Sequence, residues 1–341
     1  MDSKKCVDLR QGNPVSTQHM KRSKRRVLVT GGAGFIGSHI ADAYLAAGED
    51  VWIVDNLSSG RRENVPSKAE FLELDIRDDD VRSLFQEVRF DLVNHHAAQI
   101  DVRTSVLDPM KDASINVHGL LNLTEAAMEV GVQRFIYVSS GGVVYGEPEE
   151  LPTPETAPKS PLSPYGVTKL TGEHYLYYYQ AIRGLEYVAL RYANVFGPRQ
   201  DPHGEAGVVA IFCDRLLSGE PLTIFGEGEQ TRDYVYVGDV VAANMLASDT
   251  LMAEGIGLDT RAFNVGTGSR TSVNQLADML ESIAGNPCGR NRQPARPGEL
   301  RHSALNSGRL RKCGWAPAHT LEEGLRETFD YIANQRAGAT E

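Results

Sequence analysis

A glycine-rich segment directly after the first apolar run most constrains what this chain can fold into. The run 27–29 predicts a buried strand, and Gly31, Gly34 and Gly37 follow it before a helical stretch. Gly31 permits a tight turn, Gly34 lets the backbone approach a pyrophosphate, and Gly37 lets the helix pack closely on the strand. The N-terminus of that helix favours negative charge. The spacing therefore predicts a dinucleotide-binding strand–turn–helix unit.

The second apolar run indicates which dinucleotide is bound. It covers residues 51–54 and ends at Asp55, 24 residues after Gly31 and near the expected distance to a ribose-binding acid. A carboxylate at this place accepts hydrogen bonds from a ribose 2′-hydroxyl and repels a 2′-phosphate. We therefore predict that the cofactor is NAD rather than NADP.

Apolar runs alternate with helical stretches along the chain, and this order indicates the fold class. Most runs are continuously apolar, as expected for parallel strands that helices cover on both faces. They lie at 27–29, 51–54, 71–74, 92–96, 135–138, 187–190 and 263–265, with amphipathic segments such as 39–47 and 116–130 between them. The pattern predicts an α/β fold, a doubly wound parallel-sheet Rossmann domain with a smaller α/β substrate domain.

Changes in composition mark the domain boundaries that we expect. Residues 1–25 show no hydrophobic period and are predicted to form a mobile tail. A segment with six prolines, 148–164, is predicted to be an extended surface loop. The dinucleotide-binding domain is predicted to comprise 26–195, with 234–267 returning to it. The smaller domain is predicted to comprise 196–233 and 268–336, packed against the carboxyl ends of the strands.

Charge and cysteine content exclude several classes of protein. The 341 residues carry a formal net charge of −10, which argues against nucleic acid or an anionic membrane as partner. The four cysteines lie far apart without C-x-x-C spacing, so neither a zinc site nor a disulfide framework is predicted. His95 and His96 are consecutive in an expected strand and would face opposite sides, so no metal is expected. No apolar run approaches the roughly 20 residues of a membrane helix, and the first residues lack a secretory signal, so the cytoplasm is the expected compartment.

Three residues predict acid–base chemistry beside the dinucleotide. The pair Ser163-Pro164 is typical of a helix start, so Tyr165 and Lys169 lie on one face of the following helix. A lysine ammonium near a phenol stabilises the phenolate and lowers the phenol pKa, which makes Tyr165 a usable base near neutrality. Ser140 stands at a strand end, where an α/β sheet presents its reactive groups.

The motifs of the chain, taken together, resemble those of a known family. In order from about residue 26 to 335 they are T-G-G-A-G-F-I-G-S-H, V-D-N-L, L-D-I-R-D, H-A-A-Q, S-S-G-G-V-V-Y-G, Y-G-V-T-K, L-R-Y-A-N-V-F-G-P-R, T-I-F-G-E-G, Q-T-R-D-Y-V-Y-V-G-D-V and R-P-G-E. The chain resembles the extended short-chain dehydrogenase/reductases, and among them the nucleotide-sugar 4-epimerases that act on UDP-glucose and UDP-galactose.

The resemblance implies a Ser-Tyr-Lys triad at Ser140, Tyr165 and Lys169. Ser140 precedes Tyr165 by 25 residues, as in the family, whereas counting back from Tyr145 without a gap would place a glycine at that position. The NAD-binding residues that the resemblance implies are Gly31, Gly34, Phe35, Ile36, Gly37, Asp55, Asn56, Asp75, Ile76, Ala97, Ala98, Gln99, Asn116, Tyr165, Lys169 and Tyr192.

The same resemblance implies a site for the UDP-sugar. Its residues are Ser140, Asn194, Phe225, Arg232, Arg296, Glu299 and Ser303. The guanidinium groups of Arg232 and Arg296 would bind the diphosphate oxygens. Ser303 would border the 2-substituent of the sugar, where a serine leaves room for an N-acetyl group.

We therefore expect an NAD-dependent enzyme that inverts C4 of a UDP-hexose, including the N-acetylhexosamine forms, through a 4-keto sugar. The alternatives are a UDP-glucuronate 4-epimerase, a 4,6-dehydratase and a non-catalytic NAD-binding regulator. Dehydratases of the family carry an Asp-Glu pair after the strand-end hydroxyl residue, where this chain has Gly141-Gly142. A regulator tends to lose the tyrosine or the lysine, and this chain has both. In the family, the helix expected at 164–182 and the one near 105–130 pair with their copies, so a homodimer is expected.

Overall fold

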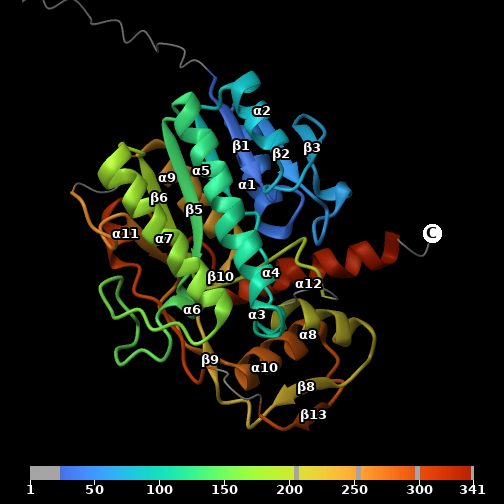
Figure 1. The fold of residues 1–341 in the computed structure, drawn as a ribbon. Coiled ribbons are helices and arrows are strands. Elements are labelled where there is room, and N and C mark those ends of the chain that lie inside the picture. The colour runs from blue at the N-terminus through green and yellow to red at the C-terminus, as the bar shows by residue number, and fades with distance from the viewer. Residues whose placement is uncertain (1–23, 203–206, 251–254, 296–299, 339–341) are drawn as a thin grey trace, which may run out of the picture.

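A parallel sheet of seven strands forms the centre of the molecule (Figure 1). The computed structural model describes residues 24–202, 207–250, 255–295 and 300–338. The strand order is β11-β6-β5-β4-β1-β2-β3. The strands are β1 (Arg26–Thr30), β2 (Asp50–Asp55), β3 (Glu70–Glu73), β4 (Leu92–His95), β5 (Arg134–Ser140), β6 (Tyr187–Tyr192) and β11 (Ala262–Val265). Each of the seven runs that the sequence analysis assigned to strands lies in this sheet, so the predicted fold class is confirmed.

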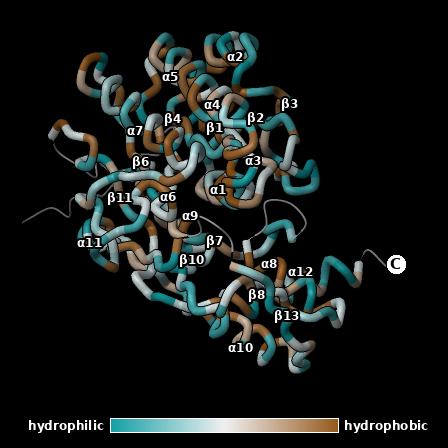
Figure 2. The backbone as a smooth tube through the Cα atoms, turned by 60° about the horizontal axis from the view of Figure 1, so that its bottom comes forward, coloured by the Kyte–Doolittle hydropathy of each residue, from teal (hydrophilic) through white to brown (hydrophobic). Residues whose placement is uncertain are grey.

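Helices cover both faces of the sheet because the strands are apolar on both sides. Alternate residues of a strand point to opposite faces, so Leu28 joins one buried cluster while Val27 and Val29 join another. The first cluster includes residues of α2 (Asp80–Val88), α5 (Gly119–Val130) and α7 (Pro164–Arg183). The second includes residues of α1 (Phe35–Ala46) and α9 (Val237–Asp249). Both apolar and hydrophilic stretches occur along the helices (Figure 2).

A third apolar cluster forms the core of the smaller part of the molecule. It contains Phe196, Phe212, Leu276 and Leu325, among others. The elements around it are α8 (Val208–Leu217), β8 (Leu222–Phe225), α10 (Val273–Ala284), β13 (Arg290–Gln293) and α12 (Leu321–Gly338), and β8 pairs with β13 in parallel. The segments predicted to leave the main sheet thus have a core of their own.

Short elements connect the two parts. They are β7 (Asn194–Phe196), which pairs with β10 (Tyr234–Tyr236), and β9 (Thr231–Arg232), which pairs with β12 (Thr271–Ser272). Helix α11 (Gly308–Lys312) differs from the expected division, because its Leu310 and the nearby Trp315 pack in a cluster of the main sheet. The predicted range 268–336 therefore contributes to both cores.

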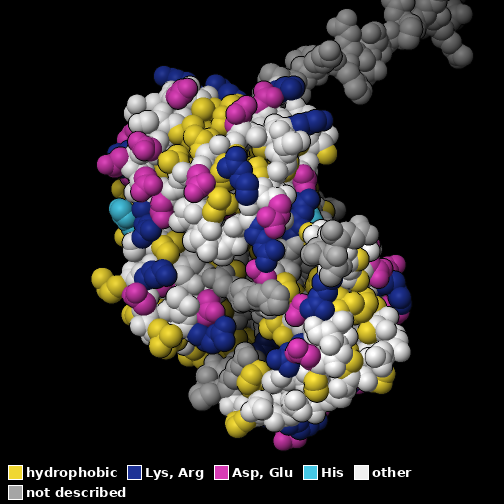
Figure 3. Space-filling model, turned by 90° about the vertical axis from the view of Figure 1, so that its right-hand side faces the viewer, with side chains coloured by type: hydrophobic (Ala, Val, Ile, Leu, Met, Phe, Trp, Pro, Cys, Tyr) yellow, Lys and Arg dark blue, Asp and Glu magenta, His cyan; other side chains and the backbone are white. Residues whose placement is uncertain are grey.

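The remaining helices lie near the carboxyl ends of the strands. They are α3 (Val102–Leu107), α4 (Pro109–Ala113), a π-helical turn (Ser114–His118), α6 (Gly141–Val144) and a 3-10 turn (Arg62–Asn64). Residues 147–163 form neither helix nor strand apart from an isolated bridge between Thr153 and Leu305, as the prolines predict. Among the described residues, no helix is both long and apolar enough to span a membrane. On the face drawn in Figure 3, acidic and basic side chains are interspersed.

Candidate active site

The glycine turn between β1 and α1 has the geometry that a close approach to phosphate requires. Gly31 has a φ of +69°, and a Cβ atom there would lie 2.6 Å from the backbone nitrogen of Ala97. A Cβ on Gly37 would lie 2.2 Å from the carbonyl oxygen of Gly31. Gly34 is the N-cap residue of α1. Only glycine fits at positions 31 and 37, because the Cβ atom of any other residue would collide with the backbone.

The residues around this turn fit a dinucleotide. Phe35 and Ile36 open α1, and the first amides of a helix have no partner within the helix and favour anions. The Nε2 atom of His96 is buried and has no hydrogen-bond partner among the described residues. A bound polar ligand would form hydrogen bonds with the first amides of α1 and with Nε2 of His96.

Asp55 lies at the end of β2 beside the glycine turn. Its two carboxylate oxygens accept hydrogen bonds from the backbone nitrogens of Ala33 (3.0 Å) and Leu57 (2.8 Å). Burial raises the pKa of Asp55, although these two bonds oppose the shift. The carboxylate is therefore held in a fixed orientation next to the turn, at the position predicted for a ribose-binding acid.

Three further residues that the resemblance assigns to NAD binding, Asn56, Asp75 and Ile76, lie next to Asp55. Asn56 donates a hydrogen bond to Asp75 (2.9 Å), and Arg77 pairs with the same carboxylate at 2.7 Å. Hydrogen bonds from Arg77 lower the pKa of Asp75 to about 2. Ile76 is buried, and a Cβ on Gly119 would lie 2.5 Å from its Cδ1.

The end of β4 brings two neutral histidines and two small residues to the turn. The Nδ1 atom of His95 lies 2.7 Å from the hydroxyl of Thr30, which also accepts a hydrogen bond from the amide of Ala97. Burial lowers the pKa of His96 to about 3 and that of His95 well below its usual value. Among the described residues no group of metal-ligating side chains occurs. Ala97 and Ala98 follow, both half-buried.

Gln99 and Asn116, both predicted to contact NAD, form hydrogen bonds with each other. The amide of Gln99 donates to Asn116 Oδ1 (2.9 Å), and Asn116 Nδ2 donates back to the carbonyl of Gln99 (2.9 Å). Asn116 Nδ2 also lies near Asp112 and Thr168. These side chains therefore fix the strand-end loop onto the π-helical turn and α7.

Helix α7 presents Tyr165 and Lys169 as the sequence predicts. Ser163 caps the helix by accepting a hydrogen bond from the amide of Gly166, and Pro164 occupies the first turn. Lys169 is buried, with its ammonium 3.0 Å from the carbonyl of Val138 and 5.9 Å from the centroid of the Tyr165 ring. Burial lowers the pKa of Lys169 to about 8. The ammonium is thus mostly charged at neutral pH and close enough to favour a Tyr165 phenolate.

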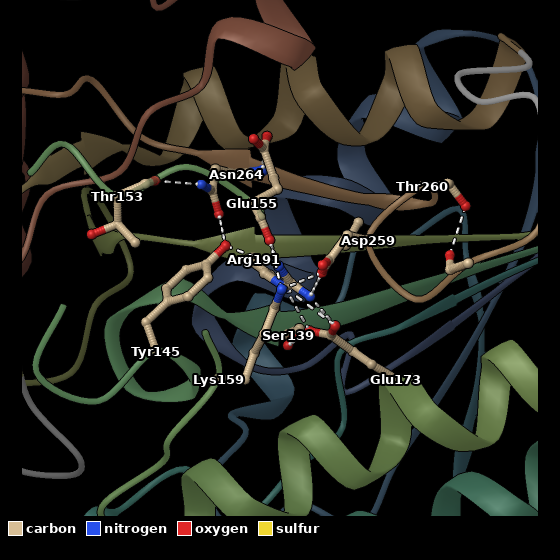
Figure 4. Close-up of polar contacts among 12 residues, drawn as sticks. Ser139, Tyr145, Thr153, Glu155, Lys159, Glu173, Arg191, Asp259, Thr260 and Asn264 are labelled. Atoms are coloured by element: carbon tan, nitrogen blue, oxygen red, sulfur yellow. Dashed lines mark hydrogen bonds and ion pairs between the residues drawn. The ribbon is translucent and has the colours of Figure 1, made fainter. Parts of the chain in front are cut away.

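Ser139 and Ser140 differ in their surroundings. Ser139 is buried and donates a 2.5 Å hydrogen bond to Glu173, whereas Ser140 is the half-buried last residue of β5. Glu173 in turn pairs with Arg191 of β6, which is fully buried (Figure 4). Because the hydroxyl of Ser139 is engaged in this ion-pair cluster, Ser140 is the better candidate for contact with substrate.

The buried ion pair connects the site to distant segments. Arg191 donates to the hydroxyl of Tyr145 (2.9 Å) and pairs with Asp259 (3.0 Å). Tyr145 donates to Asn264 of β11 (2.7 Å), and the amide of Asn264 donates to Glu155 of the proline-rich loop. Figure 4 shows these side chains converging on Arg191. The cluster holds α7, β5, β6 and β11 in one arrangement.

Tyr192 has a different environment from the one expected along a cofactor. Its side chain is buried, and its hydroxyl accepts a 2.6 Å hydrogen bond from Asn244 of α9. Its ring lies 6.4 Å from the His96 ring, centroid to centroid. The hydroxyl therefore points into the core, and only the ring or backbone is left to face a ligand.

The residues predicted for the UDP-sugar lie on several short elements. Asn194 begins β7, Phe225 ends β8 and Arg232 lies in β9, where its Nη1 donates to the carbonyl of Thr231. Ser303 is 8% exposed, and its amide donates to the same carbonyl at 3.1 Å. The predicted Arg296 and Glu299 lie outside the described residues.

Asp233 organises these elements, although no sequence pattern predicts this role. It is fully buried and accepts hydrogen bonds from the amides of Thr267, Gly268 and Leu305 and from the hydroxyl of Thr267. Its own carbonyl accepts from the amide of Asn194. The only sequence signal was its place next to Arg232, a candidate phosphate ligand.

Comparisons with known proteins agree with this geometry. The model of the NAD dependent epimerase/dehydratase family matches residues 27–266. A UDP-glucose 4-epimerase from Mycolicibacterium smegmatis is 46% identical over 316 residues, which cover 91% of this chain and 99% of that protein.

Solved structures with the same fold carry both expected ligands. The structure of a UDP-glucose 4-epimerase from Thermotoga maritima, described as with UDP-glucose, has a TM-score of 0.87 and 47% identity and covers 91% of this chain and 99% of its own. A UDP-glucose 4-epimerase from Thermus thermophilus in complex with NAD has a TM-score of 0.85 and 46% identity, with coverage of 90% and 98%.

Proposed function

The chain belongs to the NAD-dependent epimerase/dehydratase family, and we propose from this premise that it inverts C4 of a UDP-hexose, interconverting UDP-glucose and UDP-galactose. It is an NAD-dependent sugar-nucleotide epimerase. The observation that most supports the assignment of its chemistry is the buried Lys169 ammonium, 5.9 Å from the centre of the Tyr165 ring on the same face of α7. That pair lies at the strand-end edge that also carries the glycine turn and Asp55.

The chain's own residues carry out the acid–base chemistry at the sugar 4-hydroxyl. NAD supplies the acceptor and donor of the hydride at C4. Tyr165, as phenolate, takes the proton from the 4-hydroxyl, and Ser140 donates a hydrogen bond to that oxygen. Lys169 stabilises the phenolate by its positive charge in a site shielded from water. Tyr165 returns the proton after the 4-keto sugar has presented its other face, so the reaction needs no external redox partner.

The UDP part is held by the short elements of the smaller domain. Arg232 and Arg296 bind the diphosphate, Asn194 adds a hydrogen bond to it, Phe225 offers a face to the base, and Glu299 accepts from the ribose. Ser303 is small and nearly buried, which supports acceptance of an N-acetyl group beside the sugar C2. The substrate range therefore includes UDP-N-acetylhexosamines.

A second copy of the chain is the expected protein partner. Exposed apolar side chains follow one side of α7 and continue over α3 and α4, which pack against it. They are Val102, Val106, Leu107, Met110, Val167, Tyr175, Tyr178 and Ile182. Contiguous apolar surface of this kind is typical of an interface. The cytoplasm remains the expected compartment.

The direct experiment incubates the purified protein with UDP-glucose, UDP-N-acetylglucosamine and UDP-glucuronate and follows each product by NMR. We expect the 4-epimer of UDP-glucose, and of UDP-N-acetylglucosamine, without added NAD. A 4-keto-6-deoxy product would instead show a dehydratase, and no product at all would contradict the epimerase. The sequence disfavours the dehydratase, because Gly141-Gly142 stand where dehydratases of the family carry an Asp-Glu pair.

A further inference from the structure

Asp112 of α4 is a fully buried carboxylate to which none of the roles above applies. The Asp108-Pro109 pair starts this short helix, and Asp108 caps it by accepting from the amide of Lys111. Asp112 lies one turn further along and four residues before Asn116. Burial of a carboxylate is costly unless its oxygens are hydrogen-bonded, so its placement calls for a physical reason.

Three side chains donate hydrogen bonds to Asp112, and each belongs to the candidate active site or borders it. The hydroxyl of Thr168 lies 2.7 Å from Oδ2, and Oδ1 accepts from Gln99 Nε2 (2.8 Å) and Asn116 Nδ2 (3.1 Å). Thr168 directly precedes Lys169, and its hydroxyl is also 3.0 Å from the carbonyl of Tyr165. Asp112 therefore holds the turn of α7 that carries Tyr165 and Lys169.

All three donors are neutral, so the negative charge of Asp112 has no cation in hydrogen-bond contact within the described part of the chain. The nearby cation is Lys169, for which Asp112 is the charged group that favours protonation. Glu173, a carboxylate on α7 near Lys169, is already paired with Arg191.

The remaining groups that face Lys169 supply no negative charge. From β5 they are the ring of Tyr137, 5.3 Å from the ammonium, and the carbonyl of Val138. From β4 they are His95 and His96, both with a lowered pKa and therefore neutral near pH 7. From α7 itself it is Tyr165.

We propose that Asp112 is a positioning residue for the acid–base pair: its carboxylate fixes Tyr165 and Lys169 through Thr168 and places a buried negative charge opposite the buried positive charge of Lys169. This inference rests on the proposed function, because it assigns Asp112 a task in the chemistry of Tyr165. Burial already lowers the pKa of Lys169 to about 8, and Asp112 opposes that shift. Loss of the carboxylate charge moves the pKa of Lys169 lower still.

The test compares kcat between pH 6 and 10 in the holoenzyme, using UDP-glucose as substrate. Asp112→Asn removes the charge and keeps the shape. We expect the fall of kcat on the alkaline side, where Lys169 loses its proton, to move about one pH unit lower, with kcat at pH 8 reduced about fivefold. KM for UDP-glucose should change less than threefold, because Asp112 does not face the sugar nucleotide.

Three further variants separate charge from hydrogen bonding. Thr168→Val removes the 2.7 Å bond but leaves the Asp112 charge in place, so kcat should fall several-fold without movement of the alkaline limb. Thr168→Ser keeps the hydroxyl and should recover the wild-type kcat. Asp108→Asn makes the same charge change on the same helix, at an exposed cap, and should leave both kcat and its pH profile unchanged.

Thermal unfolding of each variant provides the readout that does not depend on turnover. The proposal is overturned if Asp112→Asn shifts the unfolding temperature while the pH profile stays in place, since this would be a structural role only. If Asp112→Asn does not fold, wild-type kcat in Thr168→Val would overturn the positioning role. Wild-type protein without 4-epimerisation would instead refute the proposed function, and an active wild type with an unshifted variant profile refutes only this inference.

Discussion

At the scale of single residues, the site depends on how burial sets protonation. Lys169 has its pKa lowered to about 8, whereas His95 and His96 are kept neutral in the same region. One positive charge therefore stands beside the Tyr165 ring, and the two histidines near it add none. This separation allows a tyrosine to act as a base near neutrality, since the lysine charge favours the phenolate.

Replacement of the phenol hydroxyl tests this role directly. Tyr165→Phe keeps the ring but can exchange no proton, so kcat should fall at least about 100-fold, the usual range for loss of a general base. Bound NAD, measured after denaturation, and the unfolding temperature should match those of the wild type. Tyr331→Phe removes a phenol hydroxyl from α12 of the smaller part and should leave all three quantities unchanged. Turnover above about 1% of wild type in Tyr165→Phe would refute the assignment of the base.

At the scale of elements, α7 has two different sides. Its buried side carries Lys169, Glu173 and Leu176, whereas Val167, Tyr178 and Ile182 are exposed. The sequence predicts a helix that is apolar around its circumference, and such a helix is usually covered on all sides. Within the described part of one chain these three side chains stay exposed, which favours the homodimer.

Charge on the exposed side should therefore break the association. We expect the wild type to sediment as a dimer at micromolar concentration, and Tyr178→Glu combined with Ile182→Glu to sediment as a monomer, because glutamates would be buried unpaired. Ile256→Glu changes an equally exposed apolar residue in a distant loop and should leave the dimer intact. A wild-type monomer under these conditions would remove the dimer from the proposal.

At the scale of the whole molecule, Asp233 connects segments that are far apart in the chain. Its carboxylate receives bonds from residues 267, 268 and 305, and it follows Arg232. This buried side chain therefore helps to hold the smaller part against the strand ends.

Weakening that connection should affect substrate binding more than chemistry. Asp233→Asn places an amide NH₂ against backbone donors, so we expect KM for UDP-glucose to rise about tenfold, with kcat reduced less than threefold and stability lowered by about 1–3 kcal/mol. Thr267→Val removes one of the four bonds and should give a smaller change in KM. Steady-state kinetics and urea unfolding measure these effects, and an unchanged KM in Asp233→Asn would contradict the role.

The sequence could predict what depends on local pattern. The continuous apolar runs placed all seven strands, the spacing of Gly31, Gly34 and Gly37 placed the turn, and the helix period placed Tyr165 with Lys169. Asp112 and Asp233 could not be found this way, because their partners lie 56 residues away at Thr168 and 72 residues away at Leu305. Neither burial nor such distant pairing leaves a periodic signal in the chain.

The position of β11 next to β6 also has a consequence for how the protein is made. Residues 262–265 complete the sheet, and Asn264 and Asp259 complete the cluster around Arg191. A nascent chain that has emerged only as far as β6 exposes a bare sheet edge and a guanidinium destined for the interior. At about 5–20 residues per second, that state lasts roughly 4–15 seconds on the ribosome. Until β11 is made, the edge of β6 stays unpaired. Protection by a chaperone is therefore most useful while residues 192–265 are being synthesised.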